Sequence, residues 1–299
     1  MSWTSICLAL TLHTVAPATT APPLTQHSGQ QSTTNPSAQK QNEIMPWQIY
    51  FAGGLLPDLS GLALKIGVYQ KLKRKSEEHY WRWGAGLFGS RYLKSEIYIT
   101  RAWSALFKMR LQYETWLWPG IFEGRGVGLR FDSENDNFDS ATLRSRSGEE
   151  EFQIGHALRL RPTWMHETKK WAFVNELNLR TWFIPGQKSY WYDVSYHTLI
   201  RRGELDLTLN NTPWVFHKAW QGDTGLERLW LGVLHQFTWA MRSNIVRHRL
   251  GAAFIFRPFE TIGPFPGLTL FGIGGINIVE RHRKGKLWGA MLILREFEF

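Results

Sequence analysis

The sequence predicts an all-β protein, a closed antiparallel transmembrane β-barrel of about 12–14 strands. From Pro46 onward, apolar and polar side chains alternate, which is the pattern of a strand because successive side chains leave opposite sides of the backbone. Several alternating segments exceed ten residues. That length crosses a bilayer at a tilt, whereas strands of soluble sheets have about five or six residues. Aromatic residues make up 14% of the chain and include 16 Trp.

The alternating segments follow one another at short intervals, which is typical of a barrel or sandwich. In residues 106–118, for example, Lys108 and Arg110 alternate with apolar neighbours. Fourteen strands are expected near residues 47–55, 60–72, 79–89, 94–101, 106–118, 125–132, 151–164, 170–183, 189–200, 203–215, 227–242, 244–257, 267–282 and 286–299. A soluble β-sandwich is the alternative, and strand length and Trp content argue against it.

Aromatic residues crowd the ends of these segments. They are Trp116, Trp118, Trp182, Tyr190, Trp191, Tyr192 and Trp239. Girdles of aromatic side chains at the two membrane interfaces would produce this placement. We therefore expect these residues on the outer surface of the barrel.

Composition excludes some classes of protein. Charged residues make up 20% of the chain and mean hydropathy is −0.29, which excludes an ordinary helical membrane protein. The formal net charge is +10, but the basic residues are dispersed through alternating strands, so nucleic acid is not an expected partner. The sequence contains no Walker loop, GxGxxG turn, HExxH or zinc pattern.

The chain divides into three parts. Residues 1–21 are typical of a secretory signal peptide, with an apolar run and a small-x-small cleavage site at Ala16-Pro17-Ala18. Residues 22–45 are rich in Thr, Pro, Ser and Gln, and we expect a disordered leader because such a segment buries little apolar surface. Residues 46–299 form the barrel. Cys7, the only cysteine, would leave with the signal, and a mature chain without cysteine is compatible with export.

The last residues, 287–299, alternate in twos and end on an aromatic residue, with Phe297 two positions before Phe299. This ending resembles the closing strand of bacterial outer-membrane β-barrels. The resemblance implies location in the outer membrane of a Gram-negative cell, contact with outer-membrane lipid and lipopolysaccharide, and assembly by the barrel-assembly machinery through the C-terminal strand.

The expected strand count conflicts with the sidedness of that family. Bacterial barrels keep both termini in the periplasm, with short turns there and longer loops outside. Counted back from Phe299, the long connections 133–150 and 211–224 fall on the periplasmic side, and the tight turn at 242–243 falls outside. Either one strand is miscounted or the loops are inverted, and twelve strands are as acceptable as fourteen.

Basic residues that alternate with apolar ones are expected to face the lumen. They are Lys108, Arg110, Arg159, Arg161, Arg180, Arg247 and Arg249. Clustered positive charge in a pore favours anions; the alternative is pairing with Glu114, Glu176, Glu204 and Asp206. We therefore expect a non-enzymatic channel or structural surface protein with a basic lumen and no cofactor.

A second hypothesis is a lipid hydrolase that uses Asp193, Ser195 and His197. On one strand, these side chains would share a face about 7 Å apart, as nucleophile, base and orienting carboxylate. The outer-membrane phospholipase family also places a Ser and a His two apart on one strand, in the order His-x-Ser-Asn-Gly, which this chain does not contain. The alternative is a polar lumen face.

An acidic stretch offers oxygen ligands for a hard cation. Asp132, Glu134 and Asp136 alternate in a predicted loop, and Ca²⁺ is the cation that such ligands suit. The Glu-Asn-Asp triplet within it is similar to one in barrels that deacylate lipid A, although the supporting Thr-Asn-Gly is absent. A solvated acidic loop is the alternative.

Overall fold

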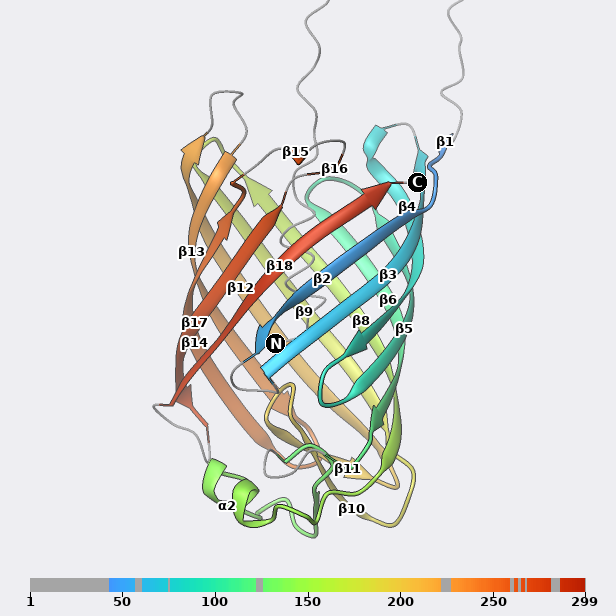
Figure 1. Ribbon diagram of the computed structural model, residues 1–299, viewed down its shortest axis with the longest axis vertical. Helices are drawn as coiled ribbons and strands as arrows, with labels where there is room; N and C mark the ends of the chain where they lie inside the picture. Colours follow the sequence, from blue (N-terminus) through green and yellow to red (C-terminus); the bar gives the residue numbers. More distant parts are fainter. Residues whose placement is uncertain are drawn as a thin grey trace, which may run out of the picture.

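The chain forms one antiparallel sheet that closes on itself (Figure 1). The computed structural model describes residues 43–56, 61–74, 76–121, 126–221, 227–258, 261–262, 265–266, 268–280 and 286–298. Each barrel strand pairs with the strands before and after it in the barrel, and β18 pairs with β2 to close the sheet. The twelve barrel strands are β2 (Gln48–Leu56), β3 (Gly61–Arg74), β4 (Ser76–Gly89), β5 (Leu93–Ala102), β6 (Phe107–Trp118), β8 (Gln153–Glu167), β9 (Trp171–Phe183), β12 (Leu205–Gln221), β13 (Glu227–Ala240), β14 (Ile245–Phe256), β17 (Thr269–Val279) and β18 (Leu287–Glu298). The predicted fold class is confirmed, with twelve strands.

Short elements lie outside the barrel sheet. They are β1 (Glu43–Ile44), β7 (Arg130–Phe131), the helix α2 (Ser140–Ser145), β10 (Ser189–Asp193), β11 (Thr198–Arg202), β15 (Thr261–Ile262) and β16 (Phe265–Pro266). The strands β7, β10 and β11 make a small sheet of their own, and β1 pairs with the end of β3. Among the described residues, no helix is long and apolar enough to cross a bilayer.

Two of the fourteen expected strands are wrong. Of the described residues 126–132, only Arg130 and Phe131 are paired as a strand, because Gly126 and Gly128 have φ values of 78° and 98° that a strand does not allow. Residues 189–200 do not form one strand either. They fold back on themselves as the hairpin β10–β11, with a turn at 194–197.

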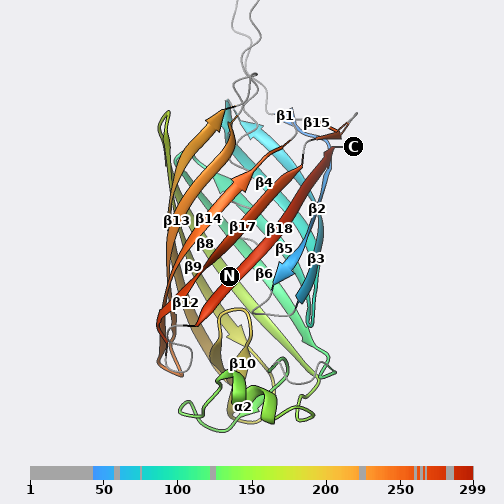
Figure 2. The same ribbon diagram turned by 60° about the vertical axis from the view of Figure 1, so that its left-hand side comes forward.

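Removing these two strands resolves the conflict over sidedness. The long connections that follow β6 and β9 now lie at the end opposite the C-terminal end of β18, together with the turn at 242–243 (Figures 1 and 2). Most of the supposed connection 211–224 is strand β12. We call the end with these long connections the loop end, and the end where β18 finishes the terminal end.

Parts of the predicted organisation lie outside the described residues. The signal peptide 1–21 and the leader up to residue 42 lie there, as does Phe299. At the end of the leader, Glu43 and Ile44 pair with Lys73 and Leu72.

The two faces of the wall differ in polarity. Apolar side chains point outward from the middle of the strands; Leu111, Leu160 and Leu179 are cross-strand neighbours on this face, and Ile97 is 61% exposed. The charged side chains of the same strands point inward and are buried. This is the opposite of a soluble protein, and it is the arrangement that a surrounding hydrocarbon layer favours.

The outer face gives the first prediction. Leu111→Arg should destabilise the folded barrel in lipid by about 2–4 kcal/mol, because a charge near the middle of the hydrocarbon is poorly solvated. Ser145→Arg, on the exposed surface of α2, is the matched control and should change stability little. Reversible urea unfolding in bilayers measures both. Equal stability of the two variants would contradict an outer wall that faces lipid.

Candidate functional site

The lumen changes character along each strand. On β6 every second side chain points inward, in the order Lys108, Arg110, Gln112, Glu114 and Trp116 from the terminal end toward the loop end. The lumen is therefore basic toward the terminal end, acidic in the middle and aromatic toward the loop end.

Three carboxylates make up the middle zone, which we call the carboxylate belt: Glu96, Glu114 and Glu176. Glu96 accepts from Lys65 Nζ at 2.6 Å and lies 2.9 Å from Lys94 Nζ. Lys94 lies on β5 with Glu96, whereas Lys65 lies on β3, two strands away, so the Lys65 pair ties the wall together across strands. Because removal of one partner leaves the other charge buried and unpaired, breaking such a pair costs about 3–5 kcal/mol.

Glu114 is the most heavily used carboxylate. Its oxygens lie 3.2 Å from Arg180 Nε and 3.5 Å from Arg159 Nη1. Gln112 Nε2 and Trp116 Nε1 also donate to it, at 2.6 Å and 3.1 Å. With Lys94 Nζ of β5 at 3.4 Å, five groups from four strands thus converge on one buried side chain, which is what a buried charge requires.

Cations outnumber carboxylates in the interior. Among the described residues that are buried, ten are Lys or Arg and six are Asp or Glu. All seven basic residues predicted to face the lumen are in this set, at 0–8% exposed. The basic residues that the sequence did not single out are Lys65, Arg82 and Lys94. The alternation of the sequence could have identified them, since each lies at a position whose side chain points inward from its strand.

The hairpin β10–β11 folds into the loop end of the lumen. The Arg180 guanidinium lies 5.1 Å from the ring centroid of Tyr196 in the hairpin turn, and Ser243 Oγ donates to Leu199 O at 2.7 Å. The ring of Trp191 on β10 packs 5.5 Å from that of Trp118 on β6. The hairpin is thus bound to the wall by polar and aromatic contacts.

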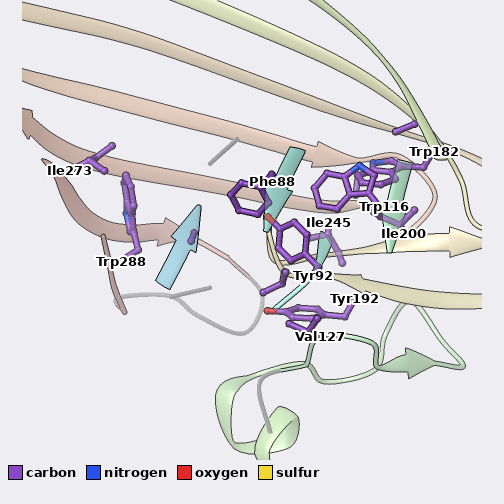
Figure 3. Packing of buried hydrophobic residues seen from close by; sticks show 14 of the residues in the cluster. Phe88, Tyr92, Trp116, Val127, Trp182, Tyr192, Ile200, Ile245, Ile273 and Trp288 are labelled. Atoms are coloured by element: carbon purple, nitrogen blue, oxygen red, sulfur yellow. The ribbon is translucent and has the colours of Figure 1, made fainter. Parts of the chain in front are cut away.

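Aromatic side chains from the wall meet the hairpin there. Figure 3 shows Phe88, Tyr92 and Trp116 side by side, with successive ring centroids 5.1 Å and 4.9 Å apart, and Tyr192 of the hairpin close by. Burial raises the pKa of the Tyr92 hydroxyl, and the nearby charge of Asp193 adds to this effect. These rings pack together at the loop end of the lumen.

The expectation that the segment-end aromatics form outer girdles is wrong for most of them. Trp116, Trp118, Trp182 and Tyr190–Tyr192 are buried inside. Strand parity could have shown this, because Trp116 and Trp118 fall on the same face of β6 as Lys108 and Arg110. Only Trp239 has the outward parity of its strand.

The structure brings Asp193, Ser195 and His197 together in a turn and not along a strand. Ser195 Oγ and the Ser195 backbone N–H both donate to Asp193 Oδ1, at 2.5 Å and 2.9 Å. His197 has a φ of 50° and pairs through Nδ1 with the Tyr192 hydroxyl at 2.5 Å. The single proton of the Ser195 hydroxyl is therefore directed to the carboxylate, whereas a nucleophilic serine gives it to a base.

Burial raises the pKa of the Asp193 carboxyl, and the positive charge of Arg180 opposes that rise. A carboxylate that accepts from the backbone two residues on forms an Asx-turn, which stabilises a reversal of the chain. Asp193 and Ser195 thus have a clear structural function in the hairpin turn.

The acidic stretch forms a loop beside β7. The Asp136 carboxylate accepts from the backbone N–H groups of Asp132 and Ser133, each at 3.0 Å. Asp132 lies 4.0 Å from Arg130 Nε, and the pKa of the Tyr190 hydroxyl is raised by its burial and by its hydrogen bond with Glu134. Within the described ranges, no three His, Cys, Asp or Glu side chains gather as a metal site. Calcium binding by Asp132, Glu134 and Asp136 stays a prediction.

No protein-family model matches the chain, and no curated protein matches it. Solved structures with a similar arrangement include the NanC porin, at 10% identity and a TM-score of 0.37 over 84% of this chain and 100% of that one. An outer membrane channel from Pseudomonas putida F1 has 10% identity and a TM-score of 0.43, over 88% and 100%. LpxR from Salmonella typhimurium has 8% identity and a TM-score of 0.38, over 84% and 100%.

The turn geometry gives a prediction for the hydrolase hypothesis. Ser195→Ala should leave fatty-acid release from phospholipid or lipopolysaccharide by the folded barrel unchanged, with or without Ca²⁺, because the serine proton is held by Asp193. His197→Ala is the companion variant, since members of a catalytic triad act as a unit. Loss of a measurable wild-type activity in both variants, with folding intact, would restore the triad.

Proposed function

We propose that the protein is an outer-membrane channel for small anions, non-enzymatic, with its loop end constricted by the β10–β11 hairpin. The observation that carries the proposal is the excess of buried cations over buried carboxylates in the lumen. The apolar outer wall and the closed sheet support a membrane location, because an open edge in lipid would leave backbone groups unpaired.

The charges in the lumen act together on a passing solute. The belt carboxylates are taken up by neighbouring cations: Glu96 by Lys65 and Lys94, and Glu114 by Arg159 and Arg180. Cations on the other wall also have amide partners; Arg249 Nε donates to Asn277 Oδ1 at 2.7 Å. The amide accepts a hydrogen bond but does not neutralise the charge. Low-dielectric walls strengthen the resulting positive potential, which favours anions.

The hairpin explains how a basic barrel would limit its own conductance. Its turn touches Arg180 on β9, and its Trp191 packs against Trp118 on β6, two strands away on the same wall. A solute that crosses the barrel must pass this layer. We also propose that the barrel assembles through β18, which pairs with β2 from Met291 to Glu298.

Bilayer recordings test the charge preference. Arg247→Gln with Arg249→Gln should lower the chloride-to-potassium permeability ratio roughly twofold or more, since two lumen charges are lost. Lys169→Gln with Lys170→Gln is the matched control, because these lysines are exposed in the β8–β9 connection. Cation preference in the wild type, or no conductance from a folded barrel, would contradict the proposal; the latter result would favour a structural role.

Shortening the hairpin tests the constriction. Replacement of residues 190–201 by two glycines should raise single-channel conductance about twofold or more, because the aromatic layer loses its inner partner. Strands β9 and β12 keep their own pairing in this variant, so heat-modifiable migration should be retained. Unchanged conductance would place the narrowest point elsewhere.

A further inference from the structure

Four cations gather on one wall of the lumen toward the terminal end. We call Arg82, Lys108, Arg110 and Arg161 the basic cluster. The register places Arg82 opposite Thr100, Thr100 opposite Arg110, and Arg110 opposite Arg161, so the row runs across four strands. Residues paired in this way have Cβ atoms about 4.5–5.5 Å apart.

Lys108 lies beside this row, two residues before Arg110 on the same face of β6. The charges that act on it include those of Arg82, Arg110 and Arg161, opposed by that of Glu176. Like charges directly opposite one another destabilise a sheet, so the row from Arg82 to Arg161 has a cost that some compensating interaction must offset.

Arg161 has little compensation from the protein. It is 1% exposed, and within the described part of the chain its Nε, Nη1 and Nη2 atoms have no hydrogen-bond acceptor. Its ion pair with Glu176 is long, at 3.8 Å. The neighbouring Arg159, by contrast, donates Nε to Asn178 Oδ1 at 2.7 Å and also reaches Glu114. Buried guanidinium N–H groups without acceptors are costly.

The other two guanidinium groups in the row stack on aromatic rings. Arg110 lies 4.1 Å from the ring centroid of Tyr98, and Arg82 lies 5.0 Å from that of Tyr69. Stacking on an aromatic ring stabilises the charge without using the in-plane N–H donors. Arg110 uses one of these donors on Thr100 Oγ1, at 3.0 Å. The guanidinium of Arg161, whose donors have no acceptor in the described part of the chain, can thus bind a planar or tetrahedral oxyanion beside these stacked groups.

We propose that the basic cluster is a binding site for a phosphate-type oxyanion, supplied as a free phosphate or as a phosphate group on a lipid. Guanidinium forks bind phosphate oxygens two at a time, which a halide cannot match. A dianion also fits the charge, because the four cations outnumber the two carboxylates whose charges act on the cluster, Glu96 and Glu176. The site rests on the proposed anion channel and names the class of solute that the channel prefers.

Binding to the folded barrel in zwitterionic detergent tests the site. Inorganic phosphate, titrated at constant ionic strength against chloride, should bind the wild type in calorimetry. Arg161→Gln should weaken binding about tenfold or more, because charge-assisted hydrogen bonds are lost. Lys108→Gln is a second variant with the same expected direction. Arg144→Gln is the matched control, because this arginine is exposed on α2 at the loop end, and its affinity should equal that of the wild type.

The outcomes distinguish a lipid phosphate from free phosphate as the ligand, and the phosphate site from the channel. Binding of a soluble short-chain phosphatidic acid, but not of inorganic phosphate, with the same dependence on Arg161 would assign the site to a lipid phosphate. Equal affinities in all variants, or no phosphate binding by a folded wild type, would overturn the inference. Phosphate binding without conductance would contradict the proposed channel and support the phosphate site. Anion-selective conductance without phosphate binding would support the channel and contradict the phosphate site.

Discussion

Closure of the sheet is the constraint on which the rest of the structure depends. Pairing of β18 with β2, from Met291 opposite Leu55 to Glu298 opposite Gln48, leaves the twelve-stranded sheet without an edge. A closed sheet satisfies its backbone hydrogen bonds internally, so its outer face can be wholly apolar. The same closure forces the opposite face of every strand into a confined interior. Charged side chains placed there have to pair with one another or with something that enters.

The interior handles this requirement differently on different strands. Around Glu114 the pairing is dense, and charges from β5, β8 and β9 converge on it. At the basic cluster, the wall supplies rings and a distant carboxylate where the belt supplies close ion pairs. Removing part of a buried ion network is far more costly than never building it. The belt is therefore best understood as structural, and the cluster as the part of the lumen whose charge is available to a ligand.

Strand alternation predicted the barrel and the inward direction of its cations, because parity is a local property that tertiary contacts do not override in a two-faced wall. It failed where the chain leaves the wall. Residues 189–200 alternate as a strand does, but their reversal depends on an Asp193 side chain that accepts from the Ser195 backbone and on a His197 with positive φ. No Gly or Pro marks this turn. A Trp at a strand end is typical of an outer girdle, but Trp116 and Trp118 share the inward parity of Lys108 and Arg110, and that parity is the signal that identifies the aromatic layer.

The position of the hairpin in the chain bears on the order of assembly. It follows β9 and packs on Trp118 of β6, both of which precede the last five barrel strands in the chain. In the order of synthesis, its partners on the first half of the wall thus come before β12, β13, β14, β17 and β18. Ser243, which holds Leu199 from the β13–β14 turn, comes later. A barrel that closed first would have to admit a hydrophobic hairpin through one end, whereas a curved half-barrel can fold around it. The β10–β11 hairpin can therefore serve as a template around which the remaining strands fold.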